Sequence, residues 1–174
     1  FQVERGEIAR RGLRLIVLPN VVSLSPLERR KLQAFVDGGG VLVADMNPGL
    51  RNAHGTFVGS AWAEELFGAR FGEGALQGEQ TVAAIAEDDA FTCPSLRAAL
   101  PFKIGECGVD VKVTTGRALA ETNAGRPVLI VKRHGKGTCI LLNFTVSSAS
   151  GIAGHLARDL LTLARVKPPV RLET

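Results

Sequence analysis

The residues that follow a short apolar run, Val41 to Ala44, stand where many α/β enzymes hold a nucleophile. In such enzymes a Ser or Cys occupies the sharp turn that ends a buried strand. This turn offers Asp45, Met46 and Asn47 instead. Asp45 could act as a nucleophile only with a magnesium site or a nearby Lys, and no DxD spacing or second acidic cluster appears. An Asp that ends a strand more often accepts hydrogen bonds from the backbone of a turn, so we predict that role for Asp45.

His54 lies in the long loop beyond this strand, a region where α/β folds commonly bind ligands. With Asp45 and Asn47 it defines a candidate cleft, which a sugar or a nucleotide could occupy. His134 and His155 have no partner that the sequence reveals. We therefore keep a small-molecule binding module as one open interpretation.

The three cysteines, Cys93, Cys107 and Cys139, form no CxxC pair, and the histidines have no zinc-ligand spacing. We expect no metal and no cofactor, and we expect the thiols to be buried. A residual cysteine hydrolase that uses Cys107 or another thiol stays open as a further alternative. The neighbouring carboxylates at 64–65 and 88–89 are typical of exposed surface rather than of a glycosidase pair. No catalytic residue is predicted.

The composition describes an ordinary globular chain of 174 residues, with 45% hydrophobic and 22% charged residues, which suits one domain. No apolar run approaches the roughly 20 residues that span a bilayer. The net charge of +4 arises from early arginines, whereas the middle of the chain is acidic, and there is no Tyr and one Trp. We thus expect neither a membrane nor a nucleic acid as partner. The chain begins with Phe1, so we expect an excised piece whose compartment is undetermined, with the cytoplasm preferred.

The first half of the chain predicts a βαβ unit. A short basic helix or turn at 4–11 precedes an apolar strand at 13–19. The segment SPLE at 25–28 supplies a helix start, and the helix ends at Asp37 before three glycines. A second buried strand follows at 41–45, and the short links require that the two strands be parallel.

The second half predicts shorter elements. The late runs RPVLIVKR and TCILLNF flank a glycine-bearing turn and indicate a β-hairpin. A last helix begins at Ser148 or Ser150 and runs to Val166, with Ile152, Leu156, Leu160 and Leu163 as its buried stripe. The remaining expected elements are a helix at 61–68 capped by Ser60, strands at 81–86, 109–115 and 118–122, and a helical turn at 94–100. We assign residues 1–166 to one domain and 167–174 to the start of a linker into a following domain.

The order of these motifs carries a family resemblance. The segment LIVLPNVVSLSPLERRKLQAFVDGGGVLVAD resembles the opening of the β-galactosidase trimerisation domain associated with family 42 glycoside hydrolases. The later EELFG, GRPVLIVKRHGKGTCILLNF and the final helix are similar to that family too. The resemblance implies an α/β fold, a flavodoxin-like three-layer sandwich with a mostly parallel sheet plus an antiparallel hairpin near the C-terminus. It also implies membership of the class I glutamine amidotransferase-like superfamily.

In those relatives the strand equivalent to VLVAD leads into a Cys nucleophile, which Met46 and its neighbours do not supply. The resemblance therefore implies a non-catalytic domain of a larger, carbohydrate-active protein, which serves oligomerisation or domain packing. Its expected partners are further copies of itself, in a trimer, and neighbouring domains of the same chain. Any glycosidase activity would belong to a catalytic barrel outside these residues.

Overall fold

The first elements of the chain form the βαβ unit that the sequence predicts. β1 (Leu15–Leu18), α2 (Pro26–Asp37) and β2 (Val41–Ala44) follow one another, and the two strands pair in parallel. The structure is a computed structural model and describes residues 8, 11–149 and 151–166. Most of the predicted basic turn at 4–11, and the predicted linker at 167–174, lie outside the described residues.

The boundaries of α2 are set by local chemistry. The Ser25 hydroxyl accepts a hydrogen bond from the Glu28 backbone N–H at 3.2 Å, and the Glu28 carboxylate accepts one from the Ser25 N–H at 2.8 Å. This reciprocal capping satisfies two amides that the first helical turn leaves without partners. At the other end Gly39 takes a positive φ of 105°. A Cβ on Gly40 would lie 2.3 Å from the Phe35 ring, so the glycines let the helix reverse tightly into β2.

A five-stranded mixed sheet continues from this unit in the order β1-β2-β9-β8-β7. β9 (Gly137–Leu142) pairs in parallel with β2, and β8 (Pro127–His134) pairs antiparallel with β9, which confirms the predicted hairpin. β7 (Arg117–Glu121) is antiparallel to β8. Four of these five strands therefore point the same way, but the reversed β8 makes two of the four pairings antiparallel. The sheet is more mixed than the expected mostly parallel sheet because the hairpin lies inside it.

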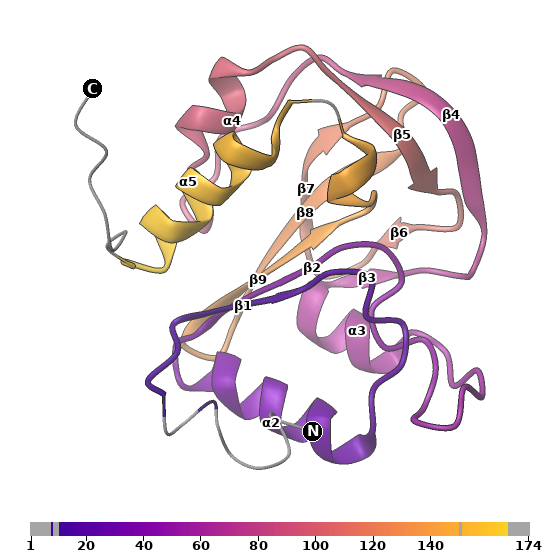
Figure 1. The fold of residues 1–174 in the computed structure, drawn as a ribbon, viewed down its shortest axis with the longest axis vertical. Coiled ribbons are helices and arrows are strands. Elements are labelled where there is room, and N and C mark those ends of the chain that lie inside the picture. Colours follow the sequence, from indigo (N-terminus) through magenta and orange to yellow (C-terminus); the bar gives the residue numbers. More distant parts are fainter. Residues whose placement is uncertain (1–7, 9–10, 150, 167–174) are drawn as a thin grey trace.

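Helices cover both faces of this sheet (Figure 1). α2 and α3 (Ala61–Phe67) lie on one face, and α4 (Pro94–Ala98) and α5 (Ala153–Leu163) lie on the other. Side chains alternate between two apolar clusters: Leu42 and Ala44 pack toward α2 and α3, whereas Val41 and Val43 pack toward α5. This alternation is the period of a strand that is buried on both faces. The result is a layered α/β domain.

The middle of the chain differs most from expectation. β4 (Ala75–Val82) and β5 (Phe102–Gly108) form a separate antiparallel pair, and β3 (Ala69–Arg70) pairs with β6 (Lys112–Val113). The expected strand at 81–86 overlaps β4 only at its end, and the one at 109–115 shrinks to β6. The reason is long-range pairing: β4 is largely polar, with a register shift between Gln77 and Gln80, and depends on β5 for its backbone partners.

The two expected N-caps have different outcomes. Ser60 is the N-cap residue of α3, as expected, but its side chain makes no capping hydrogen bond, and Gly68 ends that helix in the left-handed conformation. Ser148 lies in a short 3-10 helix, η1 (Val146–Ser148), and α5 begins after Ile152. The other proposed cap, Ser150, lies outside the described residues. Helix α5 still buries Leu156 and Leu160 as its stripe predicts.

Candidate functional site

Asp45 follows β2 directly and is buried, with 6% of its surface exposed. Its Oδ1 accepts a hydrogen bond from the backbone N–H of Asn20, in the turn that ends β1. Asn20 has a positive φ of 50°, so the carboxylate fixes a strained turn. Burial raises the pKa of Asp45, backbone hydrogen bonds from Asn20 and Val146 offset part of that rise, and the charge of Glu106 adds to it. The geometry agrees with the predicted role as a turn cap.

Glu106 on β5 is the second carboxylate near this edge of the sheet. It accepts hydrogen bonds from the Thr145 hydroxyl at 2.6 Å and from the Gln77 amide at 2.7 Å. The Thr145 bond, followed by the Gln77 bond, lowers its pKa. Two carboxylates with opposite pKa shifts form the pattern of an acid–base pair. Here, however, Asp45 accepts a hydrogen bond from the turn amide of Asn20, and Glu106 on β5 accepts one from Thr145 after β9. Both carboxylates therefore hold neighbouring segments together.

The three residues of the expected cleft lie in different surroundings. Asp45 lines an apolar groove to which neither Asn47 nor His54 contributes. Asn47 is half-buried in a left-handed turn with φ of 60°. His54 is exposed at a loop tip, where its backbone N–H donates to the Asn52 side chain at 2.9 Å.

All three thiols are buried, as the sequence predicts. Burial raises the pKa of Cys93 and of Cys107, and it raises the pKa of Cys139 to about 12. A thiol must ionise and be reached by its substrate to act as a nucleophile. These cysteines therefore pack as small apolar side chains, and Cys107 does not fit the part of a hydrolase nucleophile.

A serine and a histidine that sequence reasoning did not connect meet between α4 and α5. Ser95 Oγ lies 3.0 Å from His155 Nδ1, and the buried Asp159 accepts hydrogen bonds from the backbone N–H groups of Ser95 and Leu96 at 3.1 and 2.8 Å. In a catalytic triad the carboxylate would orient the imidazole. Asp159 instead caps the start of α4. The sequence shows the Pro-Ser helix start at residues 94–95, but it gives no sign that Asp159 lies opposite; only the fold brings the two together.

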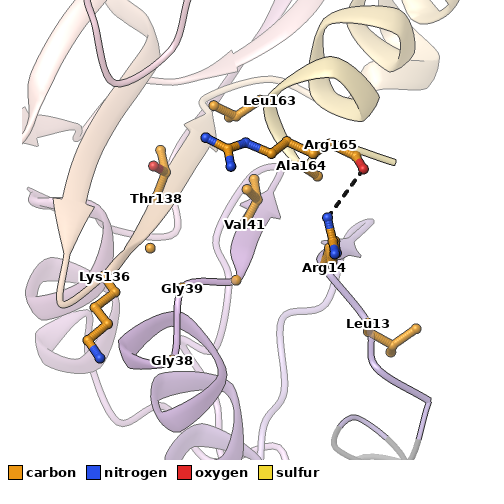
Figure 2. A pocket seen from close by; sticks show the side chains of 12 residues that line it. Leu13, Arg14, Gly38, Gly39, Val41, Lys136, Thr138, Leu163, Ala164 and Arg165 are labelled. Carbon is orange, nitrogen blue, oxygen red and sulfur yellow. Dashed lines mark hydrogen bonds between the residues drawn. The ribbon is translucent and has the colours of Figure 1, made fainter. Parts of the chain in front are cut away.

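A pocket of about 550 Å³ opens at the amino ends of β2 and β9 (Figure 2). Arg14, Lys136 and Arg165 line it together with glycines from the end of α2. Arg14 Nη1 donates to the Arg165 carbonyl at 3.5 Å, close to the end of α5. Cations are favourable beside the carbonyl ends of helices, which accounts for this basic lining. Ligands of open α/β sheets usually bind at the opposite, carboxyl edge.

Within the described part of the chain, no group of three or more His, Cys, Asp or Glu side chains could hold a metal ion. The same residues include no helix that is both long and apolar enough to cross a bilayer.

The sequence pattern of the β-galactosidase trimerisation domain matches residues 9–167. The chain belongs to this family. The domain resembles the β-galactosidase of Bacillus circulans sp. alkalophilus, with a TM-score of 0.76 and 20% identity over 91% of this chain and 24% of that one. It is equally similar to the cold-adapted β-galactosidase of Rahnella sp. R3, with a TM-score of 0.77 and 20% identity over 92% of this chain and 24% of that one. The domain therefore spans about a quarter of the length of these enzymes.

A cytoplasmic protein from Salmonella typhimurium shares the fold in a shorter chain, with a TM-score of 0.65 and 12% identity over 90% of this domain and 73% of that protein. Identities this low establish the fold alone. A comparison with curated protein sequences finds no match. Membership of this family identifies the chain as a β-galactosidase trimerisation domain.

Proposed function

We propose that this domain holds copies of a larger, β-galactosidase-like protein together, and that it also packs against neighbouring domains of its own chain. The observation that carries this proposal is the family match, which covers residues 9–167. The number of copies that the family name implies is three. Glycosidase chemistry then belongs to a part of the protein outside this chain.

The local chemistry supports a role without catalysis. The turn after β2 presents Asp45, Met46 and Asn47, of which Asp45 is engaged by the Asn20 backbone and Met46 is buried. The buried thiols give no alternative nucleophile. This arrangement favours descent from a flavodoxin-like, class I glutamine amidotransferase-like ancestor whose nucleophile turn was kept for its geometry. The parallel order β1-β2-β9 and the helices on both faces support that relationship.

We infer further that residues 1–166 form the domain and that 167–174 begin a linker to the next one. Helix α5 ends at Leu163, its last turn is closed by hydrogen bonds from Ala164, and the family match ends at residue 167. The proline pair Pro168–Pro169 in the sequence is typical of a linker and supports this boundary.

A second candidate function, the binding of a phosphate-bearing small molecule such as a nucleotide, is favoured by the basic pocket beside Arg14, Lys136 and Arg165. Its size lies in the range of ligand pockets. Thermal unfolding with and without ATP tests it, because a bound ligand raises the midpoint. An increase that R165A abolishes would favour this candidate, and an unchanged midpoint at millimolar ATP would reject it.

Sedimentation equilibrium of the chain, over concentrations from about 1 to 200 μM, tests self-association. We expect the average mass to rise with concentration toward that of three copies. In a longer protein that carries this domain beside a catalytic barrel, deletion of the domain should lower the assembly state. A chain that stays monomeric at every concentration, together with a parent whose assembly survives the deletion, would overturn the proposal.

A further inference from the structure

The loop between β2 and α3 is a well-ordered hairpin rather than an irregular connection. Residues 50–58, here called the loop hairpin, fold back so that Arg51 bridges Phe57, and the Val58 N–H donates to the Leu50 carbonyl at 2.8 Å. The hairpin also joins the segment after β1, since Arg51 bridges Ser23 in parallel. Backbone pairing on both sides fixes the conformation of the loop.

Side chains fix the tip as well. The Asn52 side chain accepts hydrogen bonds from the N–H groups of His54 and Thr56 at 2.9 and 3.0 Å, and Arg51 donates to the Gly55 carbonyl at 2.7 Å. A loop held in this way loses little further conformational freedom on binding.

The loop hairpin nevertheless exposes two large apolar side chains. Phe57 is 51% and Val58 44% exposed, which ranks them among the most exposed apolar residues described. In Figure 1 the hairpin projects from the body beside α3, away from α5. An ordered protrusion that carries an aromatic residue is typical of a protein–protein contact, where Phe is enriched.

An apolar recess lies elsewhere on the domain, between β1 and α5. This β1–α5 groove encloses about 350 Å³, and its lining includes Val17, Pro19, Val43, Leu142, Leu156 and Leu161. Val17 is 47% exposed, and no other described strand pairs with the outer edge of β1. Monomeric proteins usually cover or charge such an edge.

Symmetry decides how these two surfaces can be used. A closed ring of three copies needs a heterologous interface, in which one surface of each copy meets a different surface of the next. The domain offers one apolar protrusion and one apolar recess at separate places. Charge does not set this pairing, because Arg51 is ion-paired with Glu73 of its own chain and Asp45, the one charged residue in the groove lining, is buried. The match between the two surfaces is one of apolar character and shape.

We infer that the loop hairpin of one copy inserts Phe57 into the β1–α5 groove of the next copy, and that repetition of this contact closes the trimer. The inference rests on the proposed self-association. It names the two surfaces that carry it.

Charge substitutions at the two surfaces test the contact. In sedimentation velocity on the 174-residue chain, F57D and V17D should each weaken association at least about 30-fold, the effect of losing a central contact residue. V109D is the matched control, because Val109 is 40% exposed and belongs to neither surface; it should associate like the wild type. If the wild type associates and both variants associate equally well, the inference is wrong while the proposed function stands. If the wild-type chain never associates, the inference is wrong, and deletion of the domain from the longer protein then decides the proposed function separately.

A cross-linking pair keeps the test independent of any folding defect in the aspartate variants. A short bis-maleimide should join F57C to V17C in a mixture of the two variants, and should lock the F57C/V17C double variant into covalent rings. Each single variant alone should stay unlinked, and the wild type supplies the background because its three cysteines are buried. Equal linking of F57C to itself would indicate a symmetric contact and would refute the head-to-tail arrangement. An absence of links at concentrations where the chain associates would also refute it.

Discussion

Asn143 offers a sharp test of how the β4–β5 pair is held to the main sheet. It lies just after β9 and is buried, and its Nδ2 donates to the carbonyls of Gly108 and Pro127, each at 2.9 Å. Its Oδ1 accepts from the Gly108 N–H at 3.1 Å. One amide therefore joins the end of β5 to the start of β8. We predict that N143A destabilises the domain without altering its fold.

The magnitude follows from these three hydrogen bonds. Each contributes about 1 kcal/mol net, and a buried group left without a partner costs about 1–3 kcal/mol. The Gly108 N–H keeps the Asn143 backbone carbonyl at 3.4 Å as a weak alternative, which limits the loss. We therefore expect a decrease of about 3 kcal/mol in the free energy of unfolding. For a domain of this size that corresponds to a fall of about 6–12 °C in Tm.

Urea unfolding monitored by Trp62 fluorescence measures this change. Trp62 is the one tryptophan of the chain, and it packs edge-on against Phe67 with ring centres 6.2 Å apart, so its emission reports the packing of α3. N143D should be less stable than N143A at neutral pH, because it turns a carboxylate toward two carbonyls. Asn123→Ala, on the exposed turn before β8, is the control. An N143A loss below about 1 kcal/mol would refute the reasoning.

Three further predictions follow from burial and backbone geometry. Burial raises the folded-state pKa of Asp45, so the protonated side chain contributes stability that is fully present at low pH and is lost as pH rises from about 4 through that raised pKa. In urea titrations the wild type should therefore lose unfolding free energy relative to D45N over this range. Parallel stability profiles of the two proteins would contradict this. A disulfide reagent at neutral pH should label no cysteine of the native chain and all three in guanidinium, and in the native chain Cys139 should be the slowest to react. Rapid labelling of the native chain would contradict the burial of the thiols. Gly68→Ala should abolish folding or lower Tm severely, because the added Cβ would lie 2.0 Å from the Gly116 nitrogen. Gly55→Ala is the control: its φ is similar but the space around it is open, so it should lower the free energy of unfolding by only about 1 kcal/mol. Equal thermal shifts would refute the steric argument.

The candidate site was only partly readable from the sequence. The absence of a Ser or Cys nucleophile in the turn at Asp45 was evident, because it depends only on residue type. Its partner Asn20 could not be found, since that contact depends on β1 and β2 lying in register. His54 stood out as a loop histidine, whereas the neighbouring Phe57 is conspicuous only once its exposure is known.

The sequence by itself determined the elements whose signals are local. The apolar runs of β1 and β2, the Ser25–Glu28 capping box and the glycine turn of the β8–β9 hairpin each act within a few residues, so their types and approximate bounds could be predicted. The order of these motifs along the chain carried the family resemblance, which predicted a non-catalytic role.

The tertiary structure alone decided which distant segments meet. β9 pairs with β2, the polar strand β4 finds its partner in β5, and Asp159 of α5 caps α4. Such contacts close long loops, and their register is chosen by the burial of the whole core rather than by neighbouring residues. The loop hairpin and the β1–α5 groove belong to the same class, because exposure is a property of the folded surface.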